Sequence, residues 1–184
     1  MKHLLTVILL LLFLSCCTSE GEKTRMRAGL DILNQRNRNY ETLAVAEVQP
    51  YVDFFTHHGT PNDRMLAHYL LGIAYHDHGE APMALDCYQK AADCADTLSA
   101  ECDYGQLARV YAQMAQIFYE QGLYREQLEH GRLSSVYAWK GKDTLAALMS
   151  YTQESQVYRN LNMSDSLLYI CEHVSSLYRL SGCH

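Results

Sequence analysis

Proline and glycine are scarce in this sequence, and runs of β-branched residues are few. Of 184 residues, 3 are proline and 10 are glycine. Strand proteins depend on frequent turns and on β-branched strands, so this composition favours an all-helical protein. Basic clusters are missing too, and the net charge is −6 at pH 7. Binding to nucleic acid is not expected, because phosphates require a cationic surface.

Motifs for catalysis and metal binding are also missing. The sequence contains no GxSxG, P-loop, HExxH or CxxC motif. Its nearest metal candidate is His76-Asp77-His78, with His57 and His58 upstream. His76 and His78 project about 200° apart on an ideal helix, so their rings do not converge on one ion. We predict no catalytic residue, no metal and no cofactor; an enzyme with an unrecognised site is the alternative.

The cysteines downstream of Cys17 form no recognisable pair. Cys87 and Cys94 would lie about 10.5 Å apart along a helix, beyond the roughly 7 Å reach of a disulfide. Cys94 and Cys102 flank an expected turn between helices. They would form a disulfide only in an oxidising compartment, and buried free thiols are the alternative.

The longest apolar run is Leu4–Leu14, which follows a positive start at Lys2. A membrane-spanning helix needs about 20 apolar residues, so this shorter run fits the core of a secretory signal peptide. Ser15-Cys16-Cys17 comes next and resembles a bacterial lipobox, in which the cysteine is lipidated and becomes the mature N-terminus. Cys16 is the first candidate because the small Ser15 precedes it, and Cys17 is the second.

These features predict a signal peptide over residues 1–15, a linker over 16–23 and a helical domain over 24–184. Two acyl chains attach stably to a bilayer, because each buried CH₂ contributes about 0.8 kcal/mol. We expect a chain held by its lipid in a bacterial cell envelope, on either membrane and either face. A secretion signal with incidental cysteines is the alternative.

The stretch 71–91 recurs at 114–124 and more faintly at 155–174. This pattern resembles the tetratricopeptide (TPR) repeat, a pair of antiparallel helices. Its first helix carries Leu-Gly and Tyr, a Gly makes the turn, and its second helix carries Ala, an aromatic residue and Ala. The first repeat matches these places with Leu71, Gly72, Tyr75, Gly79, Ala84, Tyr88 and Ala91.

The resemblance implies an all-α fold of antiparallel helix hairpins in a right-handed superhelix. Both offsets between the recurrences exceed the usual repeat of about 34 residues, which predicts longer helices or turns near 96–104 and 138–144. The expected units are a divergent leading pair at 24–60 and repeats at about 64–97, 105–140 and 145–180.

Apolar residues at helical spacing predict two helices in the leading pair, over 24–37 and 48–58. Pro50 fits the first turn of the second helix, where a missing N–H costs nothing. Asn62 or Asp63 is the expected N-cap of the next helix. The last helix carries an apolar stripe that no later helix covers, which predicts a partner, a second copy or a longer protein. The stripe is Leu168, Cys171, Val174, Leu177 and Tyr178.

The resemblance further implies a partner-binding groove lined by the first helix of each repeat. The residues at the groove positions are apolar, aromatic and, in a few cases, charged, as on a peptide-binding surface. Some TPR proteins bind the C-terminal carboxylate of a chaperone tail through hydrogen-bond donors at fixed groove positions. This sequence has Tyr69 and Ile73 at such positions, so we do not expect it to be a chaperone-tail adaptor. The groove places are Leu66, Tyr69, Ile73, His76, Asp77, Arg109, Ala112, Gln116, Tyr119, Glu120, Met149, Thr152, Gln156, Arg159 and Asn160.

The layout of a lipobox followed by divergent repeats resembles TPR envelope lipoproteins of Bacteroides-type bacteria. That resemblance implies docking of a protein or peptide without chemistry. Some such proteins continue into a signalling output, which would make this chain a sensory part. A glycan-capture lipoprotein on a TPR scaffold is the alternative, although Trp139 is the only tryptophan. A groove that merely spaces other parts is the simplest interpretation.

Overall fold

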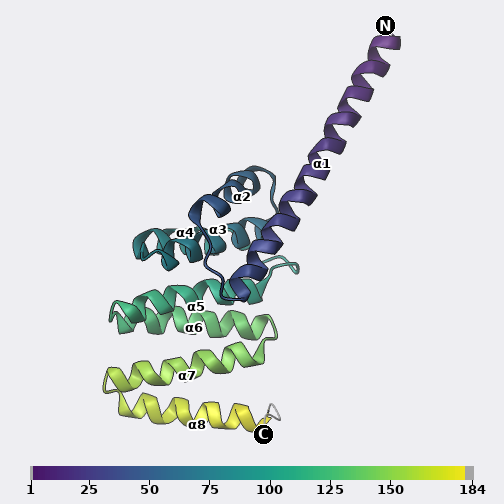
Figure 1. Cartoon of the computed structure of the whole chain (residues 1–184). Coiled ribbons are helices and arrows are strands. Elements are labelled where there is room, and N and C mark those ends of the chain that lie inside the picture. Colours follow the sequence, from purple (N-terminus) through teal and green to yellow (C-terminus); the bar gives the residue numbers. More distant parts are fainter. Residues whose placement is uncertain (1, 181–184) are drawn as a thin grey trace.

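Eight helices and no strand make up the described part of the chain. The computed structural model describes the backbone of residues 2–180 and the side chains of residues 20–172, 174 and 175. Consecutive helices pack as antiparallel neighbours in a stack, from one end of which α1 projects (Figure 1). The predicted all-α hairpin fold is confirmed. The helices are α1 (Lys2–Arg38), α2 (Val45–His58), α3 (Pro61–Asp77), α4 (Ala81–Asp93), α5 (Tyr104–Glu120), α6 (Tyr124–Lys140), α7 (Thr144–Asn160) and α8 (Ser164–Leu180).

The same left-handed turn ends five of these helices. Its central residue has φ between 55° and 79°, and the following N–H bonds the carbonyl five residues back. Such a Schellman turn satisfies the last carbonyls of the helix. Gly79 makes the turn after α3, as predicted. The five central residues are Tyr40, Gly79, Gly122, Lys142 and Asn162.

The extra length of the repeats has two sources. Ten residues, 94–103, connect α4 to α5, which confirms the longer connection predicted near 96–104. Asn62 holds this connection: its amide donates to the Glu101 carbonyl (2.7 Å) and accepts the Asp103 N–H (3.1 Å). Near 138–144, by contrast, the turn has only three residues, and the helices on both sides are longer, at 17 residues each.

The α3–α4 hairpin is held by a close approach at Gly72. A Cβ placed there would overlap the ring of Tyr88, which is fully buried. Ala84 and Ala91 are also fully buried on α4, so this helix packs tightly on its neighbours. Tyr75 is half-buried beside this core. The small residues of the signature therefore make room for the large ones.

The predicted starts of α2 and α3 are wrong. α2 begins at Val45, three residues before the predicted start, because the Glu47 carboxylate accepts the Ala44 N–H (3.0 Å) and an Arg36 N–H (3.0 Å). Pro50 therefore lies inside α2 and not in its first turn. The N-cap of α3 is Thr60, not Asn62 or Asp63. Its hydroxyl accepts the Asp63 N–H, while the Asp63 carboxylate accepts the Thr60 N–H (2.8 Å), a reciprocal capping box.

α1 forms one continuous helix and runs through residues 16–23, where we predicted a linker. Gly21 is the only weak helix former between Glu20 and Lys23, and one glycine costs about 1 kcal/mol in a helix. The side chains of Cys16 and Cys17 lie outside the described residues. In the described part of the chain, no helix is both long enough and apolar enough to cross a membrane.

The described end of α1 is tied to the stack by an ion pair. Arg27 binds the Asp63 carboxylate of α3 at two points (2.9 and 2.5 Å). Leu30 and Leu33, one and two turns further on, are buried in the main apolar core. The last turns of α1 therefore belong to the folded domain.

The second half of the stack has a smaller apolar core with buried polar contacts. Ala108, Ala138 and Ala147 form its buried apolar cluster. Arg132 of α6 bonds the buried Glu154 of α7 (2.9 Å), which also accepts the Tyr158 hydroxyl (2.7 Å). Polar contacts thus help to join α6 to α7, whereas large apolar side chains join the helices of the first half.

On α8, Ile170 is buried and faces inward. Leu168 is 62% exposed and Cys171 is exposed, while Val174 is half-buried. These three belong to the apolar stripe that we predicted to lack a covering helix. The side chains of Leu177 and Tyr178 lie outside the described residues.

Candidate partner-binding site

The candidate site lies on the surface formed by the end of α1 and by α3, α5 and α7, which we call the inner face. Its larger cavity has a volume of about 490 Å³ and opens between the α1–α2 turn, α3 and α5. Tyr69, Ile73, His76 and Asp77 of α3 line it together with Arg109 of α5, so the structure brings these predicted groove residues together. The remaining lining residues are Asn37, Arg38, Tyr40, Glu41, Thr42 and Gln113.

One end of this cavity is cationic. Arg38 and Arg109 form no ion pair with any described residue, and Arg109 donates instead to the Gln106 side-chain carbonyl (2.9 and 3.2 Å). The Tyr69 phenol, nearly fully buried, lines the same cavity as both guanidinium groups. Burial raises the pKa of Tyr69, while a hydrogen bond to Asn37 and the charges of Arg109 and Arg38 act in the opposite direction. Two guanidinium groups and a phenol therefore meet where few carboxylates compete for them.

The carboxylates around the cavity are mostly engaged. Glu120 is bound by the His76 imidazole (2.9 Å) and by the Gln116 amide (2.8 Å). Burial acts to raise the pKa of Glu120, but these two hydrogen bonds outweigh it and the pKa is lowered. Glu41 accepts from Arg36 outside the cavity (3.2 Å). Asp77, exposed at the end of α3, is the remaining acidic group on this wall.

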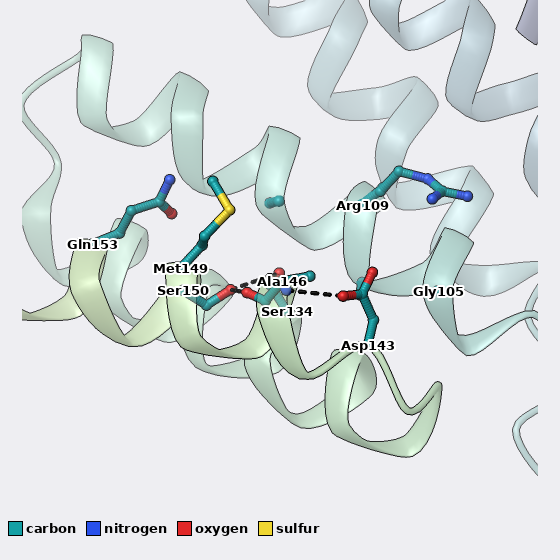
Figure 2. A pocket seen from close by; sticks show the side chains of 10 residues that line it. Gly105, Arg109, Ser134, Asp143, Ala146, Met149, Ser150 and Gln153 are labelled. Carbon is teal, nitrogen blue, oxygen red and sulfur yellow. Dashed lines mark hydrogen bonds between the residues drawn. The ribbon is translucent and has the colours of Figure 1, made fainter. Parts of the chain in front are cut away.

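A smaller cavity of about 160 Å³ opens between α5 and α7, and Figure 2 shows its lining. Its walls are small residues, Gly105, Ala108 and Ala112 on α5 and Ala146 on α7. At one end, Asp143 caps α7 by accepting the Ala146 N–H (2.9 Å). These small side chains leave a hollow between α5 and α7.

Polar residues and one flexible side chain complete the lining of the smaller cavity. Ser134 of α6 and Ser150 of α7 lie within 3.3 Å of each other at its floor, while Met149 is 57% exposed and Gln153 lies beside it (Figure 2). Arg109 lines both cavities. The two cavities are therefore neighbours on either side of one arginine.

The other predicted groove residues lie elsewhere. Leu66 is half-buried and packs against the main apolar core. Ala112 and Met149 line the smaller cavity. Seven exposed residues line neither cavity: Gln116, Tyr119, Glu120, Thr152, Gln156, Arg159 and Asn160. Sequence reasoning missed the whole α1–α2 contribution. Its one signal was Tyr40, an aromatic residue in a segment that had to be a turn; the structure leaves it 97% exposed beside the cavity.

The titratable groups that suggested chemistry have ordinary structural contacts. Within the described residues, no group of three or more His, Cys, Asp or Glu side chains is placed to hold a metal ion. His78 hydrogen-bonds the Ala74 carbonyl (2.7 Å), and His76 pairs with Glu120 as described above. Cys87, Cys94, Cys102 and Cys171 are free thiols. Burial raises the pKa of the Cys87 thiol to about 11, which disfavours the nucleophilic thiolate.

Comparison with known proteins supports the fold. No family model matches the chain, and no curated protein matches it in sequence. Among solved structures, the chain is similar to a Podosopora anserina protein described as a kinesin light chain with nearly identical TPR-like repeats. The TM-score is 0.66 at 13% identity, over 87% of this chain and 77% of that one. At this identity, the likeness shows a TPR-like repeat fold.

Proposed function

We propose that this chain is a protein-interaction module that docks a peptide or an extended protein segment on its inner face, without catalysis. The observation that carries the proposal is the cavity around Tyr69, where Arg38 and Arg109 meet without a carboxylate partner among the described residues. Its volume of about 490 Å³ lies within the range of roughly 300–1,000 Å³ typical of ligand sites. Polar groups that are already positioned lower the entropic cost of binding.

The proposal includes an anchor at Cys16, with Cys17 as the second choice, in a bacterial cell envelope. The support is the apolar run followed by a small residue and cysteine. In a Gram-negative host, metabolic labelling with a fatty acid should label the native chain and fail for a variant with both Cys16→Ala and Cys17→Ala. Single variants then assign the lipid. Labelling that survives the double substitution would refute the anchor. A sensory role in envelope signalling is the form of docking that such an anchor favours.

Site-specific photo-crosslinking tests the docking function. A photoreactive residue at Gln113, inside the larger cavity, should trap a discrete partner in envelope preparations. The matched control places it at Glu129, exposed on α6 and outside both cavities. A band seen at Gln113, absent at Glu129 and abolished by Arg109→Glu supports docking at the inner face. Equal labelling at both positions would contradict it.

Glycan capture is the second candidate, and Tyr40 favours it. An exposed aromatic ring beside side-chain amides and charged groups offers a sugar both an apolar face and hydrogen bonds. A polysaccharide binding assay with the native chain and Tyr40→Ala separates the two candidates. Retention that depends on Tyr40, together with no crosslinked protein, would replace docking by glycan capture.

Self-association through α8 is a further part of the proposal. Leu168 is a large apolar residue left 62% exposed on this helix. Light scattering at rising concentration should show a dimer that Leu168→Glu removes. The control is Val136→Glu, an apolar residue of α6 that is 49% exposed. A monomer at all concentrations would exclude this contact.

A further inference from the structure

Arg109 lines both cavities of the inner face, so a ligand that occupies both cavities must pass this residue. On α5, Ala108 and Ala112 face α7, whereas Gln113 faces α3, and Arg109 lines both cavities. A chain lying across α5 therefore passes a cationic cavity, then the Arg109 guanidinium, and then a small apolar cavity. Both halves of this surface come from the described residues of one protomer.

We infer that the inner face selects a peptide segment carrying an acidic side chain and, about three residues away, an aliphatic side chain. This inference rests on the proposed docking function and specifies its ligand. The acidic group would lie between Arg38 and Arg109 over the Tyr69 hydroxyl, and the aliphatic group would enter the cavity between α5 and α7.

Charge complementarity favours the acidic side chain. Arg38 and Arg109 have no carboxylate within ion-pair distance among the described residues, although Glu41, Asp77 and Asp143 lie in the lining of one or the other cavity. Glu41 is held by Arg36, and Asp143 is held at the N-cap of α7. Asp77 lies toward the opposite, C-terminal end of α3, where a ligand cation is favoured over an anion. The cationic end is thus a site for one carboxylate.

The size of the smaller cavity favours the aliphatic side chain. The cavity of about 160 Å³, with glycine and alanine on its α5 and α7 walls, accommodates one side chain of the size of leucine or methionine. Burial of such a side chain removes apolar surface from water and so favours binding. The exposed thioether of Met149 lies at its rim and can adapt to the shape of the incoming group.

The spacing follows from helix geometry. The cavities occupy the successive gaps α3–α5 and α5–α7, so their centres lie about one helix diameter, roughly 10 Å, apart. A peptide in the polyproline II conformation has about three residues per turn and rises about 3.1 Å per residue, so side chains three residues apart point to the same face and lie about 9 Å apart. Neighbouring acidic and aliphatic residues would not reach both cavities.

Selection from a displayed library of random peptides tests the inference with the full chain. We expect selected peptides to share an acidic residue about three positions from Leu, Ile or Met. Arg109→Glu should lower affinity for such a peptide at least tenfold, since a charge-assisted hydrogen bond is worth about 1.5–3 kcal/mol. Arg125→Glu, exposed on α6 and outside both cavities, is the matched control.

A second variant tests the other anchor. Ala112→Met fills the smaller cavity and should remove the aliphatic preference while the acidic preference stays. Circular dichroism checks that each variant remains folded. Selected peptides without an acidic residue, or with equal affinity for Arg109→Glu, would overturn the inference but leave docking intact. No selected peptide at all would overturn docking itself.

Discussion

The α3–α4 hairpin carries the sequence signature of the repeat, whereas α5–α8 carry its most regular geometry. In α3–α4, Gly72 and Tyr88 interlock within a large apolar core, yet the helices differ in length and a longer connection follows. From α5 onward, the helices are equal in length and short turns join them, although Gln127, Gly131 and Ser134 occupy the signature places of α6.

This difference shows that helix length and turn type preserve the stacking geometry when the core residues change. The Schellman turns at Gly122, Lys142 and Asn162 fix where each helix ends, and equal helix lengths then bring the next pair into the same position. Small residues, the Arg132–Glu154 pair and a few larger buried side chains, among them Leu148 and Val157, fill the interfaces of the second half. Four sets of substitutions test this difference between the two halves of the stack.

The largest effect should come from the signature hairpin. Tyr88→Ala removes a fully buried ring and should lower the free energy of unfolding by about 3–5 kcal/mol. Tyr88→Phe is the control: the Tyr88 hydroxyl is buried without a hydrogen-bond partner among the described residues, so its removal should cost nothing or stabilise. Urea denaturation measures both. Equal losses for the two variants would contradict the packing role of the ring.

Next comes the polar contact of the second half. Glu154→Ala removes the acceptor of the Arg132 Nε–H and of the Tyr158 hydroxyl, while Arg132 still donates to the Tyr158 oxygen, and should cost about 1–3 kcal/mol. The double variant Arg132→Met with Glu154→Leu should recover part of this loss, because it leaves neither an unpaired guanidinium nor a carboxylate at the buried position of Glu154. Hydrogen exchange should locate the loss in α6 and α7. If protection falls equally in α3, the two halves unfold as one unit.

Two substitutions in the Schellman turns should change the free energy of unfolding in opposite directions. Gly122→Ala places a Cβ at φ 71° and should cost about 1–2 kcal/mol. Lys142 has φ 59°, which glycine adopts without strain, so Lys142→Gly should stabilise the fold by up to about 1 kcal/mol. Thermal melts of both variants measure the difference. Destabilisation by both would mean that the Lys142 side chain outweighs its backbone strain.

The smallest effect concerns the ion pair between α1 and α3. Burial acts to raise the pKa of Asp63, but hydrogen bonds from Arg27 and Thr60 outweigh it and leave the pKa below that of an ordinary Asp, about 3.9. Its contribution is therefore present above that pH and is lost as the pH falls through the folded value. Asp63→Asn should flatten part of the decline in stability below about pH 4, at a cost near 1 kcal/mol at pH 7. An unchanged acid transition would exclude this role.

Sequence reasoning succeeded where the information is local. Gly79 at the turn and the longer connection after α4 were predicted from residue type and spacing. Pro50 was placed wrongly because a contact across the fold helps to fix the start of α2: Glu47 bonds Arg36 of α1 and so extends α2 backward. The N-cap of α3 was placed wrongly for a local reason, because the reciprocal capping box of Thr60 and Asp63 was overlooked.

The candidate site was predicted on its α3 and α5 walls and, on α7, at Met149. Tyr69, Ile73, His76 and Arg109 came from the repeat pattern, and the structure places all four around one cavity. Arg38 and Tyr40 were missed, since the leading pair has no signature that assigns positions to a face. The predicted groove residues Arg109, Ala112 and Met149 line the smaller cavity, but the hollow itself was not predicted, because alanines at helical spacing predict close packing just as readily.

The helical class, the hairpin repeat and the interlocking of Gly72 with Tyr88 follow from the sequence, since these depend on side-chain size and periodicity along one segment. That Arg38 and Arg109 line one cavity, and that a hollow remains between α5 and α7, follows from how the helices pack. Both outcomes depend on how far neighbouring helices shift and rotate when they pack. That displacement is set jointly by all the side chains between them, and no single segment of the sequence encodes it.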